Sequence, residues 1–324
     1  MVGCILNKHP KLYLSFEQSL FYSLYREWRS RVEEGEDPRS TFLAVFSESR
    51  GVRRTVSRVS LSWEEIETRV AQVEDTWGSM LNAYMCALMK YAKETAERWG
   101  DKTPHHVGSM ERIASTYSQA HFIYVYRDPR HTIASLSDVS FPHASNSRLI
   151  NAEVVRYYHN IFERQKEKIE DQSIFQLRYE RLLKQPEKTL ARLCNFLSVD
   201  YTPKLTEPAP REVRETVGWE NCKGWEKIKQ QSSRKKIYKN GILADSYINS
   251  LCDKLGYSSE SDSYIYKIFS TIMITPFVAF RRCVEYARSW KYPFTDNMFM
   301  NKFPDKVTFL SWLDLGYRVS SGSK

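Results

Sequence analysis

The chain has 324 residues, 42% of them hydrophobic and 27% charged, which suits a globular protein with one large domain or one domain plus an appendage. Its formal net charge of +9 reflects either a solvated basic surface or a positive field that attracts an anionic ligand, nucleic acid or an acidic membrane. The sequence contains no RNA-recognition signature, zinc finger or basic zipper, so we expect no nucleic-acid partner.

The six cysteines are scattered without CxxC pairs or matched histidine spacing, which argues against a bound metal and gives no disulfide framework. We therefore expect a reducing compartment and a cytoplasmic location. The start of the chain, MVGCILNKHP, does not have the pattern of a signal peptide. The longest apolar stretch, Ile268–Phe280, is too short to cross a bilayer, so we expect no transmembrane segment, while contact with a membrane surface stays open.

In the first third of the chain, a short apolar segment at Leu12–Leu14 precedes a predicted helix over Ser19–Arg31 and a loop over Glu34–Arg39. The sequence Ser62-Trp-Glu-Glu65 has the form of a capping box. Apolar residues then recur at intervals of three and four, which predicts one long helix through about Trp99 with a buried face.

Beyond this helix, apolar runs alternate with helical patterns. Gly100–Pro104 breaks the long helix, a short helix is predicted over Val107–Tyr117, Phe122–Tyr126 is predicted as a buried strand, and another helix starts near Pro129. The next predicted elements are a helix, a strand and a helix, over Ala152–Ile169, Ile174–Arg178 and Pro186–Leu197. Strands separated by helices predict an α/β fold with a parallel sheet flanked by helices.

The segment His121–Leu136 is the leading candidate for a phosphate site. The predicted strand delivers Arg127 to the carboxyl edge of the sheet, where open α/β proteins bind ligands. Asp128 can cap the next helix, whose first N–H groups would point toward the same place, and Ser135 lies about two turns further along. An ordinary Arg–Asp turn at the surface is an equally good reading of this piece alone.

Three further residues lie at predicted breaks in the chain. Lys102 follows the long helix in a turn fixed by Gly100 and Pro104, where it could place a positive charge on a transferring group. Tyr179 leaves the second strand at its carboxyl end and could stack on a base. Glu17 follows a strand-like run and could act as a general base for an alcohol. A surface lysine, a buried tyrosine and a solvated glutamate are the ordinary alternatives.

In this order and spacing the segments resemble the PAPS-dependent sulfotransferase family, where PAPS is the donor 3′-phosphoadenosine 5′-phosphosulfate. The similarity is closest to bacterial, tyrosylprotein and carbohydrate sulfotransferases with an HP-x6-E stretch, a KTP-like turn, an RDPR segment and a YE-x-L strand end. It extends roughly from Cys4 to Lys227. The resemblance implies a P-loop-like sulfotransferase domain over residues 1–257, and the residues after it predict a mainly helical extension over 258–324.

The resemblance also implies roles for individual residues. Arg127 and Ser135 match residues that hold the donor's 3′-phosphate, and Tyr179 matches a residue near the adenine. Lys102 matches the lysine that steadies the departing sulfuryl group, and Glu17 matches the base that takes the acceptor's proton. A basic loop that closes over the nucleotide in the family is matched by Lys223, Gly224 and Trp225.

One part of the family pattern is missing from the sequence. The family normally opens with a strand and a phosphate loop of PRSGTT type, which grips the 5′-phosphosulfate just before the LNKHP-like helix. Here Met1 falls inside that helix, and no such loop occurs elsewhere. Either the start of the chain has been clipped or misassigned, or the protein has lost the donor loop. As written, the sequence predicts an N-terminally truncated version of the fold with weak or absent donor binding and turnover.

The function implied by the resemblance is transfer of a sulfuryl group from PAPS to a hydroxyl or amine of an acceptor, carbohydrate or tyrosyl among others. The reaction would leave 3′,5′-bisphosphoadenosine and needs no metal. One alternative is a catalytically impaired relative that binds a nucleotide or a partner. The other is a nucleic-acid or membrane-surface binder that uses the basic run Lys223–Lys239. The sequence does not predict the acceptor or the oligomeric state.

Overall fold

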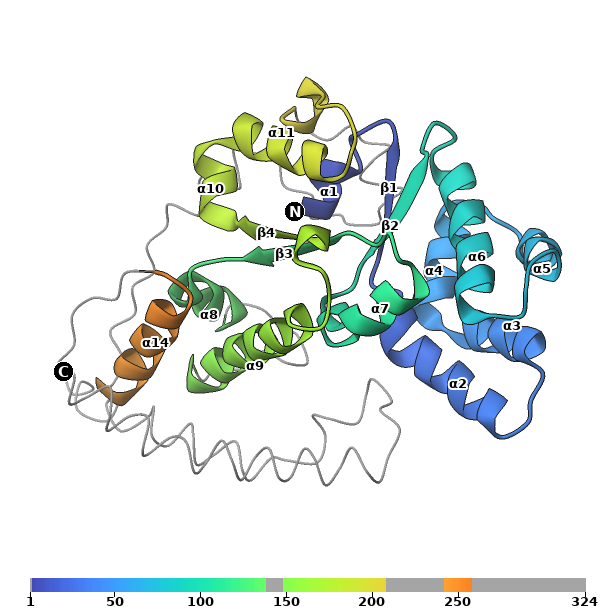
Figure 1. The fold of residues 1–324 in the computed structure, drawn as a ribbon, viewed down its shortest axis with the longest axis horizontal. Helices are drawn as coiled ribbons and strands as arrows, with labels where there is room; N and C mark the ends of the chain where they lie inside the picture. Colours follow the sequence, from blue (N-terminus) through green and yellow to red (C-terminus); the bar gives the residue numbers. More distant parts are fainter. Residues whose placement is uncertain (1, 138–147, 208–241, 258–324) are drawn as a thin grey trace, which may run out of the picture. The chain divides into compact units, whose positions relative to one another are not determined.

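The computed structural model describes residues 2–137, 148–207 and 242–257 (Figure 1). Among these residues the chain forms two compact units, one made up of residues 2–126 with 161–207 and the other of residues 127–137, 148–160 and 242–257.

In its described residues the first unit contains four strands of five residues each, arranged as two parallel pairs. Strand β1 (Leu12–Phe16) pairs with β2 (Arg98–Lys102), and β3 (Phe122–Tyr126) pairs with β4 (Ile174–Arg178). The parallel pairing and the α/β class predicted from the sequence are confirmed. Among the described residues, however, the strands form two separate two-stranded sheets rather than one continuous sheet.

Helices precede, follow and connect these strands in the first unit. They include short 3-10 and π segments, labelled η, and one helix, α9, that continues into the second unit. In chain order they are α1 (Val2–Leu6), η1 (Leu20–Leu24), α2 (Tyr25–Glu33), α3 (Pro38–Glu48), α4 (Arg50–Arg58), α5 (Trp63–Ala71), α6 (Trp77–Ala92), η2 (Pro104–Ser109), α7 (Met110–Thr116), α9 (Arg148–Lys166), η3 (Asp171–Ser173), α10 (Tyr179–Lys184), α11 (Pro186–Phe196) and η4 (Pro203–Leu205).

Side chains that accept a backbone hydrogen bond fix where four consecutive helices begin. Asp37, Ser49, Ser62 and Thr76 stand at the N-caps of α3, α4, α5 and α6, and each accepts from the N–H three residues later. The predicted capping residue Ser62 is therefore confirmed. The helix predicted over Ser19–Arg31 is formed by η1 and α2.

Two hydrophobic clusters lie on opposite faces of β1, because successive side chains of a strand point to opposite sides. Tyr13 belongs to a cluster with the buried residues of η1 and α3 to α6, such as Phe42 and Tyr84. Leu12 belongs to a second cluster with residues of α1, β4, α10 and α11, such as Leu177. In Figure 1, α2 to α6 lie together on one side of β1 and β2, with α1 and α11 on the other.

The second unit is built around α8 (Pro129–Ser137), the first part of α9 and α14 (Ile242–Lys254), with α8 and α14 in contact. The Asn151 side-chain amide donates to the Ser137 hydroxyl at 3.0 Å, which ties α9 to the end of α8. The start of α8 at Pro129 is confirmed. Helix α14 was not predicted from the sequence.

The single long helix predicted from Ser62 through about Trp99 is wrong. Helix α5 ends at Ala71. A second helix with its own cap, α6, begins at Trp77 and ends at Ala92, before β2 begins. The β2 sequence RWGDK is poor in strand-forming residues, so its pairing with β1 decides its structure, not its own propensity. Lys102 consequently ends a strand instead of lying in a turn after a helix.

The prediction of a buried strand at Phe122–Tyr126 is right in position but wrong in burial. Strand β3 is half-buried and Val125 is 41% exposed. Within the described ranges β3 has one strand neighbour, β4, so its other edge lacks the second strand that would cover it.

The cysteines also differ from expectation at one position. Cys4 is disulfide-bonded, whereas Cys86, Cys194 and Cys252 are free. Sequence spacing does not show which cysteines meet in a fold. The reducing compartment expected from the sequence stays a prediction. The predicted domain boundary between residues 257 and 258 stays a prediction, because residues 258–324 lie outside the described part of the chain.

Candidate functional site

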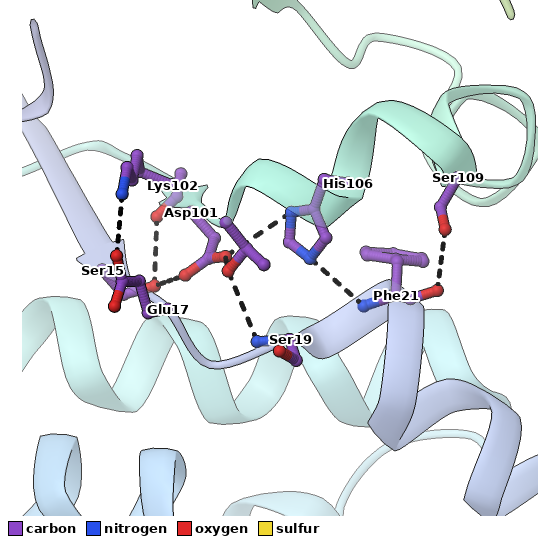
Figure 2. Close-up of polar contacts among 10 residues, drawn as sticks. Ser15, Glu17, Ser19, Phe21, Asp101, Lys102, His106 and Ser109 are labelled. Atoms are coloured by element: carbon purple, nitrogen blue, oxygen red, sulfur yellow. Dashed lines mark hydrogen bonds and ion pairs between the residues drawn. The ribbon is translucent and has the colours of Figure 1, made fainter. Parts of the chain in front are cut away.

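Glu17 and Lys102 meet at the carboxyl ends of the paired strands β1 and β2 (Figure 2). The Lys102 ammonium lies 2.9 Å from a Glu17 carboxylate oxygen, and the two side chains are 34% and 46% exposed. The Glu17 backbone N–H also donates to the Lys102 carbonyl at 3.0 Å, which extends the strand pairing by one step. The two residues predicted to be catalytic are therefore adjacent and accessible to solvent.

The backbone bends sharply just after β1. Glu17 and Ser19 have φ values of 58° and 57°, in the left-handed region that residues with a Cβ rarely adopt. The first turn of α4 packs against this bend: a methyl group placed on Gly51 would lie 3.1 Å from the Glu17 carbonyl oxygen. Glycine at position 51 thus permits a close approach of helix and bend.

A buried carboxylate, Asp101, lies beside this ion pair on β2. It accepts hydrogen bonds from the hydroxyls of Ser15, its register partner on β1, and of Thr103, the latter at 2.7 Å. The Thr103 hydroxyl in turn accepts from the Ser19 backbone N–H at 3.3 Å. Asp101 is only 4% exposed, so these hydroxyls replace the water that would otherwise solvate its charge.

His106 of η2 extends this polar network toward η1. Its Nδ1 lies 3.5 Å from the Asp101 carboxylate, and its Nε2 accepts from the Phe21 backbone N–H at 3.4 Å (Figure 2). Burial lowers the pKa of His106 below its ordinary value of 6.5, although the negative charge of Asp101 opposes that shift. The imidazole is therefore neutral at pH 7.

The predicted phosphate-binding residues Arg127 and Ser135 belong to the second unit. Arg127 follows β3 directly and α8 begins two residues later, as predicted. Asp128 accepts from the Arg130 N–H at 2.9 Å and also pairs with the Arg130 guanidinium at 2.6 Å. Burial acts to raise the pKa of Asp128, but the hydrogen bonds and charge of Arg130 outweigh it, so the pKa is lowered. Ser135 is exposed on α8.

Tyr179 is the first residue of α10 and directly follows β4, so its predicted place at the carboxyl end of a strand is confirmed. It lies in the first unit and is partly buried. Lys223, Gly224 and Trp225 lie outside the described residues. In the described ranges no group of three or more His, Cys, Asp or Glu side chains is placed to hold a metal ion, and no helix is long and apolar enough to span a membrane.

A family model described as "Sulfotransferase family" matches residues 1–203, which is more than half of the chain. The chain belongs to the sulfotransferase family. The fold resembles the "Sulfotransferase Domain from the Curacin Biosynthetic Pathway", with a TM-score of 0.53 and 19% identity over 80% of this chain and 93% of that one. It also resembles the sulfotransferase domain of the Synechococcus PCC 7002 olefin synthase, with a TM-score of 0.53 and 22% identity over 79% and 89%. No curated protein matches the chain.

The geometry of this sulfotransferase puts one acid–base group and one cation side by side. An exposed carboxylate can take a proton from a hydroxyl, and an adjacent ammonium can offset negative charge that develops on a leaving oxygen. Both groups come from the carboxyl ends of parallel strands, where open α/β proteins bind their ligands.

Sequence reasoning missed Asp101, His106 and the two hydroxyl residues around them. The available signal was the strand register: once β2 is recognised as a parallel partner of β1, Ser15 and Asp101 stand opposite each other. Side chains of cross-strand neighbours on one face interact. That signal was hidden because Arg98–Lys102 was assigned to the end of a helix and the following turn.

Proposed function

We propose that this sulfotransferase transfers a sulfuryl group from PAPS to a hydroxyl or amine of its acceptor, with Glu17 as the general base. The observation that carries the proposal is the 2.9 Å Glu17–Lys102 pair at the carboxyl ends of β1 and β2. Both residues lie inside the region matched by the family model. Carbohydrate and tyrosyl hydroxyls are the acceptor classes that the family resemblance suggests.

In this reaction Glu17 takes the proton of the acceptor hydroxyl while the acceptor oxygen attacks sulfur. The bond between sulfur and the bridging oxygen breaks, and the departing product is 3′,5′-bisphosphoadenosine. Lys102 offsets the charge that develops on the departing oxygen.

Donor recognition is assigned by resemblance to Arg127, Ser135, Tyr179 and the segment 223–225. The local structure of the second unit supports the first two assignments. Arg127 lies two residues before the start of the nine-residue helix α8, and a planar guanidinium suits a phosphate group. The N–H groups of a helix's first turn favour an anion as well. Tyr179, at a strand end, has a ring that suits stacking on adenine.

A matched pair of variants tests the proposal. Glu17→Gln removes the base but keeps its shape, whereas Glu97→Gln makes the same change in the exposed Lys11–Glu97 ion pair at the opposite end of the same strands. With radiolabelled PAPS and a panel of sugars, phenols and tyrosyl peptides, Glu17→Gln should lower kcat about 10²- to 10⁴-fold. Glu97→Gln should retain wild-type turnover.

Calorimetry that measures binding of 3′,5′-bisphosphoadenosine distinguishes a loss of catalysis from a loss of nucleotide binding. Glu17→Gln should bind this nucleotide as the wild-type protein does. Wild-type protein that binds the nucleotide but transfers no label to any acceptor would favour a non-catalytic nucleotide-binding relative. Equal turnover by Glu17→Gln and wild type would remove Glu17 from the mechanism.

A further inference from the structure

The polar network around Asp101 holds the bend that carries Glu17 at three points. Asp101 binds the Ser15 hydroxyl before the bend, Thr103 binds the Ser19 N–H within it, and His106 binds the Phe21 N–H after it. The Thr103 hydroxyl and the His106 imidazole both face Asp101. One buried carboxylate therefore connects all three contacts.

The bend needs such contacts because its backbone is strained. Glu17 and Ser19 both adopt left-handed φ angles, and neither is glycine. A left-handed conformation is unfavourable for a residue with a Cβ, so such residues keep it only where surrounding structure enforces it. The strain lies at the candidate base itself and two residues beyond it.

The hydrogen bonds of His106 define which ring nitrogen carries the proton when the imidazole is neutral. Because Nε2 accepts from the Phe21 N–H, the proton of the neutral ring is on Nδ1, on the side of Asp101. Asp101 of β2 is the charged group that faces the ring, and η1 contributes the Phe21 N–H and the Phe21 ring, at 6.1 Å between centroids. A second proton on Nε2 would set two N–H donors against each other and break the contact with Phe21.

We propose that Asp101 and His106 are positioning residues that hold the strained bend, so that the Glu17 carboxylate stays against Lys102 at the reacting centre. Neither side chain is placed to contact substrate: Asp101 is 4% exposed and His106 is 14% exposed. The pair acts through the backbone of residues 15–21. This inference rests on the proposed function for its kinetic consequences and on the structure alone for its effect on the bend.

Two substitutions of different severity test the role of the carboxylate. Asp101→Asn exchanges one acceptor oxygen for a donor, and Thr103→Val removes only the hydroxyl that links Asp101 to Ser19. Glu97→Gln, just before the opposite end of β2, serves as the control. Hydrogen exchange followed by mass spectrometry should show faster exchange of the peptide covering residues 16–24 in both variants. Exchange in α6 and in the Glu97→Gln control should stay at the wild-type rate.

Kinetics then distinguish positioning from general stability. With an acceptor that the wild type sulfates, Asp101→Asn should lower kcat about 10- to 100-fold, as expected when a catalytic group moves by about 1 Å. The KM for PAPS should change less than threefold. If Asp101→Asn does not fold, Thr103→Val carries the same prediction with a loss of severalfold.

The imidazole is tested by rescue and by pH. His106→Asn keeps a side-chain amide and should retain more kcat than His106→Leu. Because burial lowers the pKa of His106 below its ordinary value, protonation of the ring and the loss of kcat that accompanies it should appear at lower pH than for an exposed histidine. The His106→Asn profile should lack this loss and keep only the limb produced by carboxylate protonation.

The outcomes separate this inference from the proposed function. Faster exchange of the 16–24 peptide with no wild-type turnover would support the positioning role while the proposed function fails. Unchanged exchange and unchanged kcat in Asp101→Asn and Thr103→Val would overturn the positioning role and leave the proposed function intact. A fall in kcat that only follows the fraction of folded protein would also overturn it.

Discussion

Strands β1 and β2 carry a lysine–glutamate ion pair at each end of their shared register, and the surroundings of the two pairs differ. At the amino ends Lys11 and Glu97 lie 3.1 Å apart and are 45% and 65% exposed. At the carboxyl ends Lys102 and Glu17 lie 2.9 Å apart and are 34% and 46% exposed. Distance and composition are nearly the same, so neither distinguishes a surface ion pair from a candidate active site.

The difference lies in what supports each pair. Glu97 and Arg98 simply donate their backbone N–H groups to the Lys11 carbonyl, and an exposed ion pair of this kind contributes about 0–1 kcal/mol to stability. At the carboxyl ends, a buried carboxylate and a left-handed backbone accompany the pair. A protein interior accommodates such costly features mainly where function requires them. We take the supporting structure, not the ion pair, as the mark of the site.

The largest difference between the two ends should appear in turnover. Lys102→Met removes the cation expected to offset charge on the departing oxygen, and should lower kcat about 10²- to 10³-fold, the usual loss for one such electrostatic group. Lys11→Met makes the same change at the amino ends and should leave kcat unchanged. Steady-state sulfuryl transfer from PAPS measures both, and equal losses in the two variants would make the two ends functionally alike.

The free energy of unfolding should show the opposite contrast, with the larger effect at the amino end of β1, because a different lysine holds that end. Lys93, at the end of α6, donates to the backbone carbonyls of Asn7, His9 and Leu12. Lys93→Met leaves these carbonyls without their donor and should lower the free energy of unfolding by about 1–3 kcal/mol. Lys90→Met, on the exposed side of the same helix, should change it by less than about 0.5 kcal/mol.

The effect of Lys93 also depends on pH, with a defined sign. Burial lowers the pKa of Lys93 to about 8, from 10.5 in the unfolded chain. Between these values the unfolded chain binds more protons than the folded one, so the wild type gains stability from Lys93 as pH rises. Urea titrations from pH 7 to 10 should show the difference between wild type and Lys93→Met growing. A difference that shrinks over this range would show that Lys93 is not desolvated in the folded protein.

The sequence predicted the parts of the fold that depend on local pattern. The strand at Phe122–Tyr126 and the cap at Ser62 follow from apolar runs and capping chemistry, and both are present. Strand β2 was missed because RWGDK has neither an apolar run nor β-branched residues, and its structure comes from pairing with residues 86 positions earlier. Tertiary pairing of this kind leaves no local signature.

The same limit explains what was found and missed at the site. Glu17 and Lys102 were identified by motif and lie in contact in the structure, although Lys102 was placed in the wrong local structure. Asp101 and His106 have no motif of their own, since their roles arise from burial and from the register of β1 with β2. Residues that touch substrate recur in motifs, whereas residues that position them depend on each chain's own packing.

The smallest expected effect concerns the strain that only the carboxyl end contains. Ser19, in the bend, and Ser60, after α4, form a matched pair for this comparison because both are serines with left-handed φ values, 57° and 55°. Glycine relieves the roughly 1–2 kcal/mol penalty of this conformation but gives back about 0.5–1 kcal/mol as lost chain entropy. Ser19→Gly and Ser60→Gly should therefore each raise the free energy of unfolding by a few tenths to about 1 kcal/mol. Only Ser19→Gly should also lower kcat, by severalfold, because a relaxed bend no longer holds Glu17 against Lys102; an equal kcat in both variants would mean that the strain has no part in catalysis.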